Sequence, residues 1–184
     1  MMLQSLISTH KSLTQANLLR RLLLPITVLI LMTLCPRLHA DSYDTMRVQW
    51  VTMQTGASNS MSDPDVAASV NSVANAANNY WSTMDTTPGA AYLWSNLTDF
   101  TNSATIDSCF GRLRSMAFAY AQPGNSLQGN ASLAQAIIYG LDWLNTNYYN
   151  QSTTEFGNWW DWEIGDAQAF MTTALLVYPQ LTST

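Results

Sequence analysis

The sequence predicts an all-α protein assembled from antiparallel helical hairpins. Apolar residues recur at steps of three and four positions along four separate segments, which is the spacing of one buried helix face. Helix-start residues and turn residues separate these segments, and no stretch of alternating apolar and polar residues reaches a comparable length. These patterns favour helices throughout and give no support for a sheet.

Two helices are expected in the part of the chain that directly follows residue 40. The first spans about 44–55 and places Trp50 on its apolar side. The second begins at Ser62-Asp63-Pro64-Asp65, where a cap residue precedes acidic residues and a proline, and it ends before Pro88-Gly89. The segment Leu93–Leu97 is then expected to form a packed connector.

Three further helices follow. The third is expected over 104–121, before a turn-forming segment, and the fourth over 131–149. Gly140 lies inside the fourth helix, where glycine costs roughly 1 kcal/mol against alanine, so close helix packing is expected there. The fifth helix is expected over 165–178, ended by Pro179.

Residues 1–40 are interpreted as a secretory signal segment. A polar, basic start is followed by an apolar run over 22–35, which is shorter than the roughly twenty residues that span a bilayer. Cleavage after Ala40 would leave one domain over 41–184, secreted or periplasmic, with no stable membrane anchor. A short membrane anchor at the same segment is the alternative.

The composition of the exported part excludes several kinds of partner. Twelve acidic residues but only three arginines follow residue 40, which gives a formal charge of −9 and disfavours nucleic acid and anionic membranes. No histidine follows residue 40, and Cys109 is the single cysteine there, so a zinc site and an internal disulfide are not expected. Cys109 is expected to be a buried, inert thiol, and we expect no metal or other cofactor.

The segment Asn158-Trp159-Trp160-Asp161-Trp162-Glu163-Ile164 carries the strongest functional signal. Three tryptophans within four positions cannot all face one core, whether on a helix or on a strand. Exposed indoles suit the apolar C–H faces of sugar rings, while amides bind sugar hydroxyls. Asn158, Trp159 and Trp160 are therefore the candidate substrate-binding residues, against the alternative that the rings belong to the core.

The other members of the segment are expected to be structural. Asp161 and Glu163 can cap the fifth helix, because carboxylates stabilise the positive end of a helix dipole. A paired-carboxylate glycosidase is the alternative, although residues two apart at such a junction rarely face each other across a sugar. Trp162 is expected to pack inside.

Six sequence blocks, in order, resemble a known family. They are Arg47-Val48-Gln49-Trp50, Leu93-Trp94-Ser95-Asn96-Leu97, Arg112-Leu113-Arg114-Ser115-Met116-Ala117, Tyr120-Ala121-Gln122-Pro123-Gly124, Gly140-Leu141-Asp142-Trp143-Leu144 and Asn158-Trp159-Trp160-Asp161-Trp162-Glu163-Ile164-Gly165. The last block is highly specific, and the others are individually weak. Together they resemble the N-terminal helical domain of polysaccharide lyase family 8, which holds hyaluronate, chondroitin AC and xanthan lyases.

The resemblance implies an incomplete (α/α) toroid and cleavage of uronic-acid-containing glycans by β-elimination. It implies that Asn158, Trp159 and Trp160 form an aromatic patch that positions the polymer. The family's catalytic Asn, His, Tyr and Arg follow the tryptophan block, beyond Thr184, so no catalytic residue is assigned here. The chain is accordingly expected to be an N-terminal fragment that is inactive alone.

The expected partner, an acidic polysaccharide, conflicts with the negative charge of the chain. Only Arg47, Arg112 and Arg114 could meet a uronate, and the two on the third helix are expected to be solvated or structurally paired rather than substrate contacts. Two other function classes remain open, namely a secreted α/α glycoside hydrolase fragment and a non-catalytic carbohydrate-binding module. A hydrolase would need an acid pair across a cleft, whereas a module needs only the aromatic rings.

Overall fold

The computed structural model describes residues 42–181, so the signal segment expected at 1–40 lies outside the described residues. The elements are α2 (Ser42–Thr55), α3 (Pro64–Ser82), α4 (Ser103–Ala121), α5 (Ala131–Asn147), the π-helical turn η1 (Asp161–Gly165) and α6 (Asp166–Leu181). Across this described range there is no strand, and Trp94 and Leu97 form an isolated bridge in the connector. The all-α prediction is confirmed.

Side-chain caps explain where three of the helices begin. The Asp63 carboxylate accepts hydrogen bonds from the backbone N–H groups of Asp65 and Val66 at the start of α3. Asn102 and Asn130 do the same for the first turns of α4 and α5. Each cap satisfies backbone donors that have no partner within the helix, so these boundaries follow from local sequence.

The end of α6 differs from the prediction. The helix continues through Pro179 to Leu181, although proline was expected to end it at Tyr178. Proline removes one backbone donor, but here it stands in the last turn. Leu181 is half-buried against the core, and this packing accounts for the extra residues.

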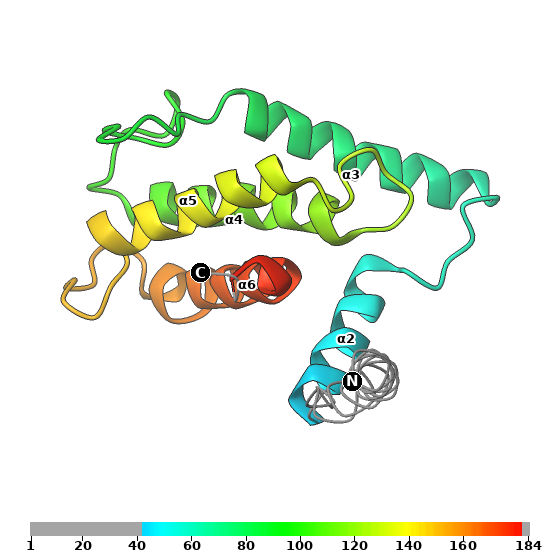
Figure 1. Ribbon diagram of the computed structural model, residues 1–184. Helices are drawn as coiled ribbons and strands as arrows, with labels where there is room; N and C mark the ends of the chain where they lie inside the picture. Colours follow the sequence, from blue (N-terminus) through cyan, green and yellow to red (C-terminus); the bar gives the residue numbers. More distant parts are fainter. Residues whose placement is uncertain (1–41, 182–184) are drawn as a thin grey trace, which may run out of the picture. The chain divides into compact units, whose positions relative to one another are not determined.

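Helix α4 is the centre of the fold. It packs against α3, α5, α6 and η1, and more weakly against α2, and Figure 1 shows α3 and α6 on different sides of it. Its fully buried side chains include Ile106, Cys109, Phe110, Leu113 and Met116. The expectation of a buried Cys109 is confirmed, and burial raises the pKa of its thiol to about 12, which keeps it protonated and unreactive.

The connector between α3 and α4 is packed, as expected. Leu93 and Trp94 are almost completely buried, and the Trp94 indole N–H donates to the Tyr80 carbonyl over 2.8 Å. Trp143 on α5 donates its indole N–H to the Ala90 carbonyl over 3.0 Å. Trp94 therefore fastens the connector to the preceding helix α3, and Trp143 fastens it to α5, which follows much later in the sequence.

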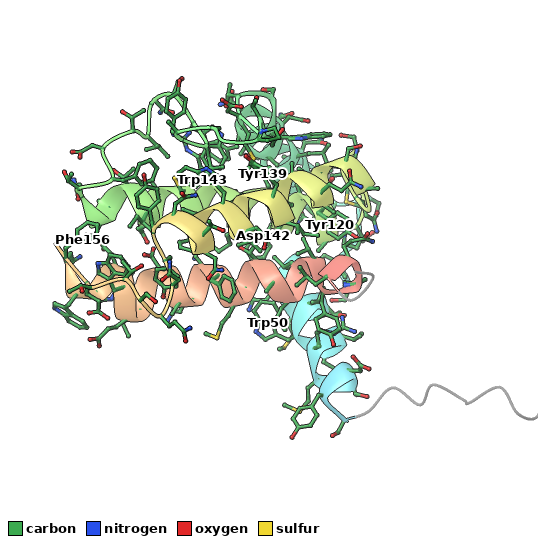
Figure 2. All side chains as sticks on the ribbon, turned by 60° about the vertical axis from the view of Figure 1, so that its left-hand side comes forward. Trp50, Tyr120, Tyr139, Asp142, Trp143 and Phe156 are labelled. Carbon is green, nitrogen blue, oxygen red and sulfur yellow. The ribbon has the colours of Figure 1, made fainter. Side chains whose placement is uncertain are left out.

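Trp50 is half-buried and packs at the edge of the core rather than inside it. Figure 2 shows it on α2, whereas Trp143 lies on α5. Trp50 lines a groove of about 540 Å³ between α2 and α6, together with Met53, Leu175 and Tyr178. The apolar side predicted for α2 is partly buried only at Trp50, because Met46 and Met53 on the same side are largely exposed. Of the helices within residues 42–181, none is long and apolar enough to cross a membrane.

Gly140 confirms the expected close packing. A Cβ atom placed on Gly140 would lie 2.6 Å from Leu113 Cδ2 and 2.9 Å from Met84 Cε. These distances are shorter than any side-chain contact allows, so α5 approaches α4 and the segment after α3 closely because residue 140 has no side chain.

Asp166, the first residue of α6, is a buried acid without a hydrogen-bond partner on either carboxylate oxygen. Burial, and then the charges of Asp107 and Asp161, raise its pKa to about 8. The side chain is therefore neutral at neutral pH.

We expect Gly140→Ala to lower the free energy of unfolding by about 1–3 kcal/mol, because the new methyl group overpacks the contact with Leu113. Gly111→Ala is the matched control, since its Cβ would meet nothing within 4 Å and α4 would gain helix propensity. Urea denaturation measures both. Equal stability of the two variants would contradict the close approach.

The stability of the protein should fall as the pH rises from about 4 to about 8. In that window the folded state keeps the Asp166 proton and the unfolded state has released it, so each pH unit costs up to about 1.4 kcal/mol. Asp166→Asn, which cannot ionise, should remove this contribution. Urea denaturation across the window, with Asp142→Asn at an exposed position as the control, tests it. Parallel pH profiles for the protein and Asp166→Asn would refute the assignment.

Candidate functional site

The tryptophan segment forms the first turn of a helix rather than a polar loop. Trp159 and Trp160 are already helical, and the π-helical turn η1 connects them to α6. The Asn158 Oδ1 atom accepts from the Trp160 N–H over 3.2 Å, and the Asn158 carbonyl accepts from the Asp161 N–H over 3.1 Å. Asn158 thus caps a helix that begins earlier than the sequence indicated.

The three indoles have different environments, as the sequence predicts. Trp159 and Trp160 are 61% and 46% exposed, whereas Trp162 is 5% exposed. Trp162 stacks on Tyr149 with ring centroids 5.7 Å apart, and its N–H donates to the Phe156 carbonyl over 2.6 Å. Trp162 is therefore structural, and the expected exposure of Trp159 and Trp160 is confirmed.

A buried carboxylate ties this turn to the central helix. Asp161 is 7% exposed, and its Oδ2 atom accepts from the hydroxyl of Ser103 on α4 over 2.6 Å. Its Oδ1 atom accepts from the Asn158 Nδ2 atom over 2.9 Å, and the Asn158 backbone N–H donates to the Ser103 hydroxyl over 3.0 Å. We call Ser103, Asp161 and Asn158 the anchor, because these three hydrogen bonds hold the start of the turn against α4.

The anchor changes the interpretation of three residues. Asn158 uses both side-chain atoms inside the turn, and each keeps the capacity for one more hydrogen bond, to a sugar hydroxyl for example. Asp161 binds Ser103 and Asn158 instead of capping the fifth helix. Ser103 was missed, because nothing in its local sequence marks it as a partner of a residue 58 positions away.

The two acids of the segment do not form a catalytic pair. Asp161 is buried in the anchor, whereas Glu163 is exposed on η1. A glycosidase needs two carboxyl groups facing one sugar across a cleft. The geometry therefore does not fit the hydrolase alternative at these residues.

The interior beside the aromatic turn is acidic. Burial, and then the Asp161 charge, raise the pKa of Asp107 on α4, while Arg114 lowers it. Asp107 and Asp161 together outweigh the one Arg114 charge that reaches Asp107, so this region has no excess positive charge with which to attract a uronate. Within residues 42–181 no three His, Cys, Asp or Glu side chains are grouped to hold a metal ion.

Two of the three candidate arginines have structural contacts. Arg112 donates to Asn96 Oδ1 over 3.0 Å and lies over the rings of Tyr80 and Trp94. Arg47 pairs with Asp44 over 3.2 Å and lies over Tyr178. The structural role expected for Arg112 is confirmed, and Arg114 is exposed on α4.

The arrangement can bind a ligand through ring faces. It presents two exposed indoles on a turn anchored to the core, next to an amide with remaining hydrogen-bonding capacity. We call Asn158, Trp159 and Trp160 the aromatic patch. The patch itself contains no group that titrates near neutral pH, so it is suited to binding and orienting rather than to proton transfer.

The sequence of this chain is similar to those of known polysaccharide lyases. Residues 50–184 match the model of polysaccharide lyase family 8, N terminal alpha-helical domain. The chain is 36% identical over 148 residues to a xanthan lyase of Bacillus sp. (strain GL1), covering 79% of this chain and 16% of that protein. It is also 36% identical to a hyaluronate lyase of Thermasporomyces composti, covering 77% of this chain and 18% of that protein.

Solved structures agree with these matches. A Paenibacillus xanthan lyase superimposes with a TM-score of 0.73 at 39% identity, over 78% of this chain and 14% of that chain. The chondroitin AC lyase of Streptomyces coelicolor A3, solved with chondroitin sulphate, gives a TM-score of 0.71 at 32% identity, over 78% and 19% of the two chains. The chain thus spans less than a fifth of each of these four relatives. The chain belongs to polysaccharide lyase family 8, and its antiparallel helical hairpins are part of the N-terminal helical toroid of that family.

Proposed function

We propose that this chain is the glycan-positioning N-terminal part of an exported polysaccharide lyase that acts by β-elimination on a uronic-acid-containing polysaccharide. The observation that carries the proposal is the pair of exposed indoles, Trp159 and Trp160, on a turn held by buried hydrogen bonds. The xanthan, hyaluronate and chondroitin AC lyases similar to this chain support an acidic polysaccharide as the substrate class.

Stacking explains how an acidic protein domain binds an acidic polymer. The C–H face of a sugar ring packs on an indole through dispersion and burial of apolar area, which needs no positive charge on the protein. The carboxylate of a uronate projects from the edge of the ring and can remain in solvent. The patch therefore provides affinity and orientation, and neutralisation of the uronate falls to groups outside it.

The chemical step has requirements that the patch does not meet. β-Elimination removes the proton at C5 of the uronate and expels the oxygen at C4, which leaves a C4–C5 double bond. A base must accept the proton, and donors must stabilise the charge that develops on the carboxylate. In this proposal those groups belong to the remainder of the enzyme, and the aromatic patch holds the polymer in line with them.

Export is the second part of the proposal. The basic start and apolar run of residues 1–40 support a secretory signal, which would leave a secreted or periplasmic domain from Asp41 onward. N-terminal sequencing of the exported protein should begin at or near Asp41. Recovery of an exported chain that retains residues 22–35 would contradict cleavage.

Trp159→Ala and Trp160→Ala should each weaken binding of hyaluronan, chondroitin or xanthan oligosaccharides by about 1–3 kcal/mol, the range measured for stacked nucleobases. Titration calorimetry with each oligosaccharide measures the loss, and the double variant should lose more. Circular dichroism should show unchanged helix content, because both rings are largely solvent-exposed in the free protein.

Trp143→Ala and Trp162→Ala are the matched controls, because each removes a buried indole. Both should lower the free energy of unfolding by about 3–5 kcal/mol. Trp143→Ala should leave the affinity per folded molecule unchanged. Normal affinity in the Trp159→Ala/Trp160→Ala double variant would refute the binding role of the patch.

A further inference from the structure

Gly165, at the end of η1, lies directly against the ring of Trp160. A Cβ atom on Gly165 would come within 2.6 Å of Trp160 Cζ3 and 3.1 Å of Trp160 Cε3. On the side of α4 it would come within 2.9 Å of Asp107 Oδ1. The space that any side chain at residue 165 would need is therefore already occupied by the indole and by the Asp107 carboxylate.

The π-helical turn explains why these two residues meet. In an α-helix each residue advances by about 100°, so residues five apart point in directions about 140° apart. In a π-helical turn the hydrogen bond joins residues five apart, as it does here between the Asp166 N–H and the Asp161 carbonyl. The wider turn brings Gly165 beneath Trp160, a contact that a regular helix would not make.

We propose that Gly165 is the seat of Trp160, a positioning residue that sets the plane of this indole for stacking on the glycan. The inference rests on the proposed function of the aromatic patch and adds a residue to which no role has been assigned. The six-membered ring of Trp160 rests on the Gly165 backbone, while the indole remains 46% exposed on its other side. The anchor holds the start of the turn at Asn158, and Gly165 holds the Trp160 ring in place.

A methyl group at residue 165 would displace the Trp160 ring and the Asp107 carboxylate rather than the apolar core. The buried side of the contact is formed by backbone and by Asp107 on the central helix, whereas the outer side of Trp160 faces solvent. The indole would therefore tilt outward, away from its present position against Gly165. The helices beneath would keep their packing.

The first experiment measures glycan affinity in three glycine variants with oligosaccharides of hyaluronan, chondroitin and xanthan. Gly165→Ala should weaken binding by about 3- to 30-fold, part of the loss expected for a missing stacked ring. Gly111→Ala, whose Cβ meets nothing within 4 Å, should bind normally. Gly140→Ala, whose Cβ collides inside the core, should lose stability but keep its affinity per folded molecule.

A double-variant cycle shows whether Gly165 acts through the ring. In a Trp160→Ala background there is no indole to displace, so adding Gly165→Ala should cause no further loss of affinity. The chemical shift of the Trp160 indole N–H should move in Gly165→Ala and stay unchanged in Gly111→Ala. If Gly165→Ala alone fails to fold, Trp160→Ala should restore folding at least in part, because it removes the collision with the indole and leaves the contact with the Asp107 carboxylate.

Each outcome supports or overturns the proposal that Gly165 positions the Trp160 indole. Loss of affinity in Trp160→Ala but normal affinity in Gly165→Ala would overturn it and leave the proposed function intact. A loss from Gly165→Ala that persists in the Trp160→Ala background, or a folding defect that Trp160→Ala does not lessen at all, would also overturn it. Normal affinity in Trp160→Ala itself would instead refute the role of that ring in the proposed function, and the seat with it.

Discussion

The burial of α4 is the constraint on which the rest of the structure depends. Helices α3, α5 and α6 pack around it, and it contributes more buried residues than any other helix of the described range. Such a helix cannot shift without disturbing every neighbour, because protein interiors are closely packed. Ser103 stands at its first turn and binds Asp161. The turn that carries the aromatic patch is therefore hydrogen-bonded to the most rigidly packed helix of the fold.

Two buried acids near the aromatic patch, Asp161 and Asp166, are accommodated in opposite ways. Asp161 accepts two hydrogen bonds from side chains, which offsets the cost of removing a carboxylate from water. Asp166, five residues later, has no such partner and stays neutral instead. Neutral Asp166 adds no charge to the repulsion between Asp107 and Asp161. One buried acid therefore orders the turn, and its neighbour is tolerated by holding a proton.

Much of the fold could be predicted from the sequence because its determinants are local. The apolar periods place the helices, and Asp63, Asn102 and Asn130 cap three of them within one or two residues of the expected starts. The exceptions depend on packing between distant segments. Leu181 extends α6 past a proline, and Trp50 lines a groove at the edge of the core. No local pattern contains that information.

The candidate site shows the same division. Three adjacent indoles predict that some must be exposed, and Trp159 and Trp160 are. The sequence does not reveal Ser103, which meets Asp161 only after α4 and α6 have packed, nor the π-helical turn that brings Gly165 under Trp160. Residue types thus indicate which rings are exposed, whereas tertiary packing determines how they are held. For stacking on a sugar the second property matters as much as the first, because an indole free to rotate must lose that freedom on binding.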